Sequence, residues 1–330
     1  MIGNTLRRTL GILALAAVPA FFAAAEAGAQ GTAGAASLLI TPGARADGMG
    51  RAHAAVADDG TANWWNPAAL GAMEGHVFSL MHTQLVPDLA DDVYYEYLGY
   101  SQYLQGWGGI GFNVIFLTYG ESVATDEEGR EKGTFSSYEI SPAVSAGTRL
   151  TSNLYAGVTL KFVYVNLAPP EFTLDGEAGT GNTFGADFGL LFRPTGTPLR
   201  LAGVVQNLGP NIAYIDEDQS DPLGRNLKLG LGLSLLENDN MTLLATFDFN
   251  QSLITHEGKF EEQIYNWGSE FSYGNLMALR AGYILDDQGA IKDPTFGFGL
   301  TYKSLTFDYA SVPQAEELAR VSKFSLNYRF

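Results

Sequence analysis

A few short motifs in this sequence consist of residue types that could do chemistry. Residues 106–111 read Gly-Trp-Gly-Gly-Ile-Gly and satisfy the G-x-G-x-x-G pattern of a nucleotide-binding loop. Such a loop needs a strand before it and a helix after it, because the helix N-terminus holds the pyrophosphate. Here a strand-like pattern follows, which predicts a glycine-rich turn instead. Asp187-Phe188-Gly189 copies a kinase element, but it lies inside a predicted strand without the other kinase motifs.

The sequence gives equally little support for a metal site or a catalytic nucleophile. Among the four histidines, His76 and His82 share one face of a predicted strand, yet they lie over ~19 Å apart along it, too far to share a metal ion. Cysteine is absent, no loop has the D-x-D-x-D-G spacing of a calcium site, and no G-x-S-x-G occurs. We therefore predict no catalytic residues, no metal site and no cofactor, and we do not expect an enzyme.

Composition narrows the class of protein. The 330 residues include 46 % hydrophobic but only 17 % charged residues, with 39 Gly, 20 Phe and 16 Tyr, which is typical of glycine-punctuated aromatic strands. Acidic residues outnumber basic ones 36 to 19, giving a net charge of −17. Phosphate binding needs clustered Lys and Arg, so nucleic acid is not an expected partner.

Residues 1–29 have the three parts of a secretory signal peptide. Arg7 and Arg8 give a basic start, residues 10–25 are apolar, and Ala27-Gly28-Ala29 is a cleavable A-x-A site. No later stretch reaches eighteen uninterrupted apolar residues, so we expect no transmembrane helix in the mature chain. The protein is therefore expected to be exported, and any residence in a membrane must come from a closed barrel.

From residue 76 onward the sequence alternates with a period of two. Leu227, Leu229 and Leu231, for example, alternate with Lys228, Gly230 and Gly232. Apolar residues on one face, and Gly, hydroxyls and charges on the other, are typical of a strand that crosses a bilayer at a tilt. The pattern predicts about fourteen strands, an even number that suits a closed antiparallel barrel: 76–85, 93–104, 107–119, 134–149, 154–167, 183–193, 199–208, 227–236, 241–252, 262–273, 276–286, 295–303, 305–312 and 322–330.

Turns and aromatic residues support a membrane location. Short turns would face the periplasm, and longer acidic loops, such as 120–133, 209–226 and 287–294, would face outside. Aromatic residues crowd the predicted strand ends, where girdles lie at headgroup level: Tyr94, Tyr95, Tyr97, Tyr100, Tyr103, Tyr265, Trp267, Tyr302 and Tyr309. Together with the signal peptide, these features predict a location in the outer membrane of a Gram-negative-type bacterium, with outer-membrane lipid as a partner.

The last strand ends the chain on an aromatic residue. Phe324, Leu326, Tyr328 and Phe330 alternate with polar residues. This resembles the C-terminal signal by which bacterial outer-membrane barrels are recognised by the barrel-assembly machinery for insertion. We assign these four residues as the insertion signal.

Residues 30–75, before the first strand, are predicted to plug the lumen as a hatch, and residues 76–330 to form the barrel. A barrel of this size is too wide for its own side chains to fill. Residues 44–70 are rich in Ala and Gly, follow neither period cleanly, and carry two adjacent Trp, Trp64 and Trp65. These Trp are expected to wedge the plug where it turns into the first strand.

Charged hatch residues are expected to pair with the barrel wall. Arg45, Asp58 and Asp59 could pair with inward wall charges such as Lys161 or Arg280 in this confined space. Pro142, inside a predicted strand, cannot donate a ladder hydrogen bond and is a candidate site for a lateral gap or a simple bulge.

Ten residues of this stretch carry a family resemblance: Arg45, Met49, Gly50, Asp58, Asp59, Trp64, Trp65, Asn66, Pro67 and Ala68. The pattern resembles the N-terminal signature of the PorV/PorQ family of bacterial outer-membrane proteins, and of the wider FadL-type superfamily, whose hatch carries an Asn-Pro-Ala motif. Arg51 and His53 depart from it, since a small residue is usual after Met-Gly. The resemblance implies a fourteen-stranded barrel with an occupied lumen.

The implied function divides in two. PorV-like members serve type IX secretion by binding the C-terminal domain of secreted cargo proteins and passing them between secretion components. FadL-like members carry hydrophobic small molecules through the hatch and out through the wall. The signature is closer to PorV/PorQ, so a protein-binding role in secretion is the main expectation, and a channel for a hydrophobic ligand is the alternative.

Overall fold

The structure is a computed structural model, which describes residues 33–126, 128–173, 176–214, 220–256, 259–260, 263–315 and 318–330. The predicted signal peptide, residues 1–29, lies outside the described residues.

Fourteen strands form a closed antiparallel barrel, as the alternation predicts. Each strand pairs with its neighbours in the chain, and the first closes on the last, from Val77 opposite Arg329 to Thr83 opposite Lys323. The wall strands are β1 (His76–Gln84), β2 (Val93–Leu104), β3 (Gly108–Thr125), β4 (Glu131–Arg149), β5 (Leu154–Ala168), β6 (Gly179–Phe192), β7 (Leu199–Leu208), β8 (Asn226–Glu237), β9 (Met241–Ser252), β12 (Ile264–Tyr273), β13 (Met277–Asp286), β14 (Ile291–Tyr302), β15 (Leu305–Val312) and β16 (Val321–Arg329).

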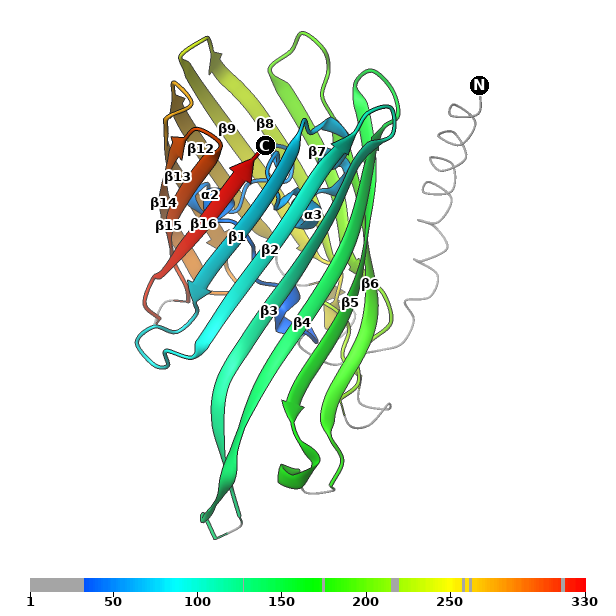
Figure 1. The fold of residues 1–330 in the computed structure, drawn as a ribbon, viewed down its shortest axis with the longest axis vertical. Coiled ribbons are helices and arrows are strands. Elements are labelled where there is room, and N and C mark those ends of the chain that lie inside the picture. The colour runs from blue at the N-terminus through cyan, green and yellow to red at the C-terminus, as the bar shows by residue number, and fades with distance from the viewer. Residues whose placement is uncertain are drawn as a thin grey trace.

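The two ends of the barrel differ. One end, here called the turn end, holds the short connections and both ends of the wall, His76 and Phe330. The opposite end, the loop end, holds the longer connections and the hairpin of β3 and β4, which projects well beyond the other strands (Figure 1).

The predicted loop 120–133 is wrong, because β3 and β4 continue as strands through most of it. Alternation is lost there because both faces of the projecting hairpin meet water. The predicted loop 287–294 is also too long, since β14 begins at Ile291.

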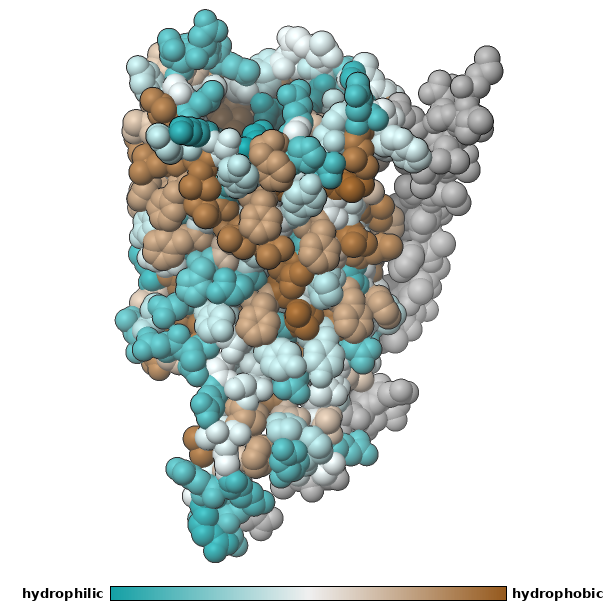
Figure 2. All heavy atoms as spheres, in the orientation of Figure 1, coloured by the Kyte–Doolittle hydropathy of each residue, from teal (hydrophilic) through white to brown (hydrophobic). Residues whose placement is uncertain are grey.

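On the face of the barrel that Figure 2 shows, apolar residues gather across the middle of the wall, with polar residues towards both ends. Outward-facing apolar side chains of the wall include Leu160, 57 % exposed, and Phe184, 65 % exposed. Tyr95 and Tyr97, however, are fully buried and point into the lumen, so their assignment to the aromatic girdle is wrong. Side chains alternate along β2, and the girdle can therefore hold only every second residue of that run.

Residues 33–75 lie inside the barrel and are almost entirely buried. Within them, short helices form where the sequence follows no long period, namely η1 (Ala36–Leu38), α2 (Ala44–Gly48), α3 (Ala62–Trp65) and η2 (Pro67–Ala72). We call this segment the hatch; its helices appear blue inside the wall (Figure 1).

Few elements lie outside the wall and the hatch. Within the described part of the chain, these are η3 (Pro170–Phe172) and the two-stranded β10–β11 sheet (Thr255–His256, Lys259–Phe260), both at the loop end. None of the helices in the described ranges is both long and apolar enough to cross a membrane. Gly106 and Trp107 lie in the turn from β2 to β3, and residues 108–111 begin β3, so a strand rather than a helix follows the glycine-rich turn.

Candidate functional site

The hatch meets the wall where the wall has glycine. A Cβ atom on Gly157 of β5 would lie 2.2 Å from the carbonyl carbon of Pro67, and one on Gly282 of β13 would lie 2.1 Å from the amide nitrogen of Gly50. Such approaches are closer than any real Cβ contact, so these positions exclude a side chain. Further wall glycines within 3.2 Å of hatch atoms by the same measure are Gly99, Gly109, Gly111, Gly147, Gly189, Gly230, Gly232, Gly268 and Gly297.

These inward-facing wall glycines, here called the glycine cradle, explain both the glycine content of the wall and the small residues of the hatch. Inward wall glycines let the hatch backbone approach the strands closely, and the small Ala and Gly residues of the hatch fit against them. The hatch is therefore packed against the wall as a core is packed, rather than lying loosely in a pore.

Asn66 anchors the Asn-Pro-Ala motif. Its Oδ1 accepts a hydrogen bond from the Ala68 amide at 3.0 Å and so caps η2, with Pro67 in the first helical position. Its Nδ2 donates to the backbone oxygens of Ala54 at 3.0 Å and of Leu190 at 3.2 Å, one in the hatch and one in β6. One side chain thus starts a helix, joins two hatch segments and fixes both to the wall.

Trp64 and Trp65 lie within the hatch rather than at its junction with β1, contrary to our expectation. Trp65 is fully buried and its Nε1 donates to the Pro42 oxygen at 2.9 Å. The two indoles pack edge to face, with centroids 4.8 Å apart. Lys228 of β8 lies over both, its Nζ 5.1 Å from the Trp65 ring. A cation over two buried rings ties this hatch segment to the wall.

Arg45 makes the hatch's main ion pair, but its partners differ from those expected. Its guanidinium donates to Glu270 of β12 at 2.8 and 2.9 Å, and it also pairs with Asp58 inside the hatch. Asp58 and Asp59 make no ion pair with Lys161 or Arg280 among the described residues.

The wall bases that we expected to hold the hatch pair with wall acids instead. Arg280 binds Glu270 and Asp308, each at 2.7 Å. Lys161 binds Asp187 at 2.8 Å.

Backbone groups around Met49 and Gly50 are held by wall side chains that the sequence did not single out. Thr295 Oγ1 accepts from the Gly50 amide at 2.9 Å and donates to the Gly48 oxygen at 3.0 Å. Asp248 Oδ2 accepts from the amides of His53 and Ala54 at 3.0 and 2.9 Å. Both wall residues are isolated polar side chains at inward-facing strand positions, and that sequence feature could have predicted these contacts.

A second hatch–wall ion pair joins Lys323 of β16 to Asp47. Its Nζ lies 2.6 Å from the Asp47 carboxylate and also donates to the Thr41 oxygen at 2.8 Å. Asp47 in addition accepts from the side chain of Thr41 at 2.7 Å.

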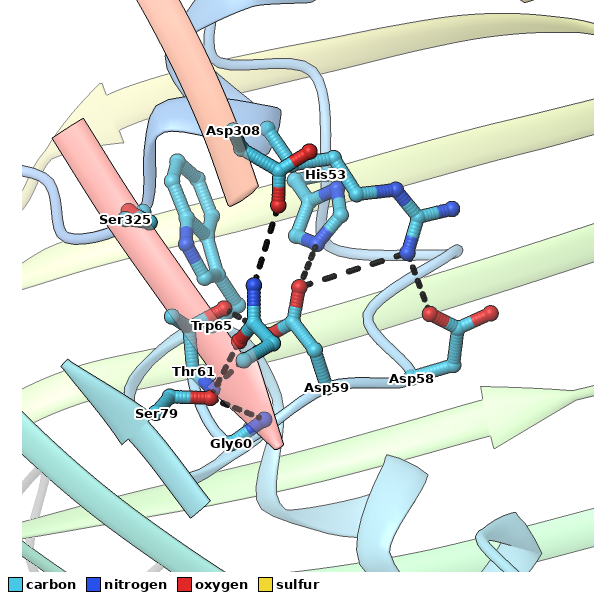
Figure 3. Close-up of polar contacts among 12 residues, drawn as sticks. His53, Asp58, Asp59, Gly60, Thr61, Trp65, Ser79, Asp308 and Ser325 are labelled. Carbon is cyan, nitrogen blue, oxygen red and sulfur yellow. Dashed lines mark hydrogen bonds and ion pairs between the residues drawn. The ribbon is translucent and has the colours of Figure 1, made fainter. Parts of the chain in front are cut away.

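His53, Asp59 and Thr61 form a cluster with a superficial likeness to a hydrolase site (Figure 3). Thr61 Oγ1 donates to Asp59 Oδ1, and His53 Nε2 lies 3.9 Å from Asp59 Oδ2. Neither ring nitrogen of His53 makes a hydrogen bond within the described part of the chain. Nucleophilic catalysis needs a hydroxyl bonded to its base, so this arrangement lacks the first requirement.

A small polar cavity lies between the hatch and strands β3 to β6. It has a volume of about 10 Å³, room for roughly one water, and is lined by Asn63, Asn113, Ser141, Lys161 and Asp187 among others. The Oδ1 of Asn113 and the Oγ of Ser141 have no hydrogen-bond partner among the described residues.

Beside this cavity the ladder between β4 and β5 is interrupted. Ile140 pairs with Tyr164 and Ala143 with Lys161, but the two residues between, Ser141 and Pro142, have no partner in β5. Pro142 has no N–H to donate, which accounts for the gap without a change of register. Pro142 still lies opposite Val114 on its other side.

The final strand lies in the closing seam. Phe324, Leu326, Tyr328 and Phe330 are exposed on the outer face. Phe330 exchanges backbone hydrogen bonds with His76, at 3.0 and 3.2 Å, and its ring stacks on the His76 ring at 5.3 Å. Whether this strand directs insertion stays a prediction.

Tyr214 and Asp126, both at the loop end, have shifted pKa values. Burial raises the pKa of Tyr214, in the loop between β7 and β8, and the nearby Glu139 carboxylate raises it further. Hydrogen bonds from Arg130 lower the pKa of Asp126, at the tip of the β3–β4 hairpin. Both groups keep their ordinary charge at neutral pH.

Comparison with known proteins gives a family and a fold. A family model described as type IX secretion system protein PorV matches residues 23–257. Solved structures with a similar fold include the Ralstonia pickettii toluene transporter TbuX (15 % identity, 88 % of this chain and 98 % of that chain, TM-score 0.52). They also include the Pseudomonas putida toluene transporter TodX (17 %, 87 % and 96 %, 0.53) and a Pseudomonas aeruginosa FadL homologue (12 %, 88 % and 99 %, 0.51). Comparison with curated proteins finds no match.

Proposed function

The chain belongs to the PorV family of type IX secretion system proteins, and on that premise we propose that it is a closed outer-membrane barrel that binds secreted proteins during their export. Its role is binding and transfer rather than catalysis. The partners would be cargo proteins or other components of the secretion system.

The proposed membrane orientation follows from the two ends of the barrel. Outer-membrane barrels place short turns in the periplasm and longer loops outside. The turn end would then face the periplasm, and the loop end, with the projecting β3–β4 hairpin, would face outside. In this proposal residues 1–29 are removed as a signal peptide, residues 30–75 are the hatch, and residues 76–330 are the barrel.

The observation that carries the proposal is the fit between the hatch and the wall glycines. A Cβ on any of several wall positions would overlap hatch backbone, as Gly157 against Pro67 illustrates. A lumen packed in this way leaves the outer surfaces and loops, rather than an open pore, as the parts available to a partner. Proteins recognise such surfaces, whereas a solute would first have to displace the hatch.

A second candidate function has a specific observation of its own. The break in the ladder at Pro142 adjoins a cavity between hatch and wall. If the hatch shifted, this seam is where a small hydrophobic molecule would leave the lumen sideways. Passage of a hydrophobic ligand is therefore the alternative function.

Native purification separates the two functions. The barrel is extracted gently from its own outer membrane, and everything that co-purifies is identified by mass spectrometry. Secreted proteins that share a C-terminal β-domain, or other secretion components, support the binding role. Apolar ligands without protein partners would replace it with the transport role.

A further inference from the structure

The hatch begins at the opposite end of the lumen from the point where it joins the wall. It enters β1 at the turn end, next to Gly75. Its first described residues lie instead against the described parts of the connection between β7 and β8, residues 209–214 and 220–225, at the loop end. There the Gly34 amide donates to the Pro222 oxygen at 2.8 Å, within a parallel bridge between Gly34 and Leu223. The hatch therefore runs the length of the lumen.

Four successive backbone amides at this end are each bound by an acceptor. After Gly34, the Ala35 amide donates to the Tyr214 hydroxyl at 3.2 Å. The next two amides, of Ala36 and Ser37, donate to the two oxygens of the Glu139 carboxylate, at 3.1 and 2.9 Å. We call residues 34–37 the latch segment. Two of its acceptors belong to the loop and one to wall strand β4, so the segment joins the loop to the wall.

The loop is shaped to accept small residues. A Cβ on Gly34 would lie 2.4 Å from Cγ2 of Ile212, so a larger residue has no room there. Ile212 and Leu223 are fully buried and pack with Ala35 and Leu38. The amides of Ile212 and Asp221 each donate to the other's oxygen at 2.8 Å, which gives this part of the loop a ribbon form.

Glu139 is the fixed point of the arrangement. Its side chain is 2 % exposed, and it also accepts a hydrogen bond from the Tyr119 hydroxyl of β3. A buried carboxylate needs several donors, and here two of them are backbone amides of the latch segment. The sequence places no other negative charge within the segment that could compete.

We propose that Glu139, Tyr214, Pro222 and Ile212 form a slot for a tight turn of small residues, and that the protein's own latch segment occupies it and ties the described parts of the loop, residues 209–214 and 220–225, to the wall. This inference extends the proposed function and rests on its membrane orientation, in which the loop between β7 and β8 faces outside. By holding that loop, the latch segment would determine whether the loop is open or closed to a partner. A partner that opens the loop from outside must detach the start of the hatch.

Hydrogen exchange in the purified barrel tests the latch. The amides of Ile212 and Asp221 report on loop opening, because exchange rises with the population of the open form. Tyr214→Phe removes one acceptor and Gly34→Val overfills the slot. Each should raise exchange at these two amides about five- to tenfold, the size expected when one hydrogen bond or a close contact is lost. Tyr283→Phe makes the same chemical change across the barrel, where the hydroxyl donates to the Lys292 oxygen, and should leave exchange unchanged.

Supplying the peptide separately tests the slot itself. A synthetic peptide with the sequence of residues 33–38 should restore slow exchange to the Gly34→Val protein, while the same peptide carrying Val in place of Gly should not. Equal exchange in Gly34→Val, Tyr214→Phe and the control, within twofold, would overturn the latch. Failure of the peptide to slow exchange would overturn the slot.

Cysteine labelling separates this proposal from the orientation on which it rests. The natural chain has no cysteine, so single substitutions give clean probes. On intact cells, an impermeant maleimide should label Ala33→Cys, while Thr197→Cys at the turn end should react only after the outer membrane is opened. Labelling of Ala33→Cys only in opened cells would overturn the orientation. Outside labelling with unchanged loop exchange would overturn the latch alone.

Discussion

Arg45 of the hatch holds Glu270 of the wall by two parallel hydrogen bonds, at 2.8 and 2.9 Å. A bidentate guanidinium–carboxylate pair fixes orientation as well as distance. The same carboxylate also binds Arg280, so it is the shared partner of one hatch cation and one wall cation.

Replacing this carboxylate should loosen the hatch. Glu270→Gln removes the carboxylate that Arg45 and Arg280 share, but Arg45 keeps Asp58 and Arg280 keeps Asp308 as acidic partners. We therefore expect a loss of stability below the about 3–5 kcal/mol that a buried charge left without any partner costs. We expect a lower urea midpoint for unfolding and faster hydrogen exchange in α2. Glu237→Gln, on an exposed strand end, is the matched control. A midpoint equal to that of the control would show that the ion pair does not hold the hatch.

The glycine cradle predicts a sharp positional effect. Gly157→Val puts a side chain into the Pro67 backbone and should destabilise the folded barrel by about 1–3 kcal/mol or prevent the hatch from seating. Gly203→Val is the control, since its Cβ would lie 3.8 Å from the nearest atom, ordinary contact. For both variants, stability is measured as the temperature at which the band of the compact, folded barrel disappears on an SDS gel. Equal melting of the two variants would contradict close packing of the hatch.

Substitutions of Asn66 should separate two contributions to stability, namely the cap of η2 and the hydrogen bonds that the side-chain amide donates. Asn66→Asp keeps an oxygen to cap η2 but loses the donor to Ala54 and Leu190, whereas Asn66→Ala loses both. A lost cap costs about 0.5–2 kcal/mol, so the Ala variant should be less stable than the Asp variant by roughly that amount. Urea unfolding of the two proteins gives the difference. A less stable Asp variant would mean that the buried charge, rather than the cap, dominates.

Removing the plug should open the lumen. Deletion of residues 44–68 takes out α2, α3 and the Trp pair, and a barrel of fourteen strands cannot fill that space with wall side chains alone. The conductance of the barrel in planar bilayers should rise from near zero to a stable open level. Retention of the compact band on an SDS gel shows that the deleted chain still forms a barrel. Unchanged conductance through such a barrel would argue against a lumen plug.

The terminal aromatic residue should matter for assembly. Removing Phe330 takes away both its bonds to His76 and the proposed insertion signal, so less protein should reach the outer membrane as a compact barrel. Phe330→Tyr keeps an aromatic ring and serves as the control. Normal insertion of the truncated chain would defeat the signal assignment.

Sequence reasoning recovers the wall well because a bilayer imposes a strict period. Bounds such as Val93–Leu104 and Leu199–Leu208 coincide with the predicted ranges. Where the bilayer stops constraining the chain, the pattern fails, as in the β3–β4 hairpin. Tyr95 shows the other weakness, since density of aromatic residues alone does not reveal which face each ring takes.

Partner choice inside the lumen is harder to predict. Arg280, Lys161 and Arg45 are recognisable from sequence as unusual charges, yet Glu270, Asp308 and Asp187 decide where they bind. That choice depends on the register between strands and on where the hatch backbone lies, neither of which a local pattern contains. The latch segment is invisible for the same reason, because small residues carry no chemical signal until an acceptor faces them.

The hatch also sets an order for assembly. The wall is a ring closed by β1 and β16, which join residues such as Val77 and Arg329, far apart in the chain. A segment that packs this closely against glycines on strands around the lumen would have little room to enter once the ring had closed. We therefore expect the hatch, which is synthesised first, to serve as the form around which the strands gather, with the joining of first and last strands as the final step.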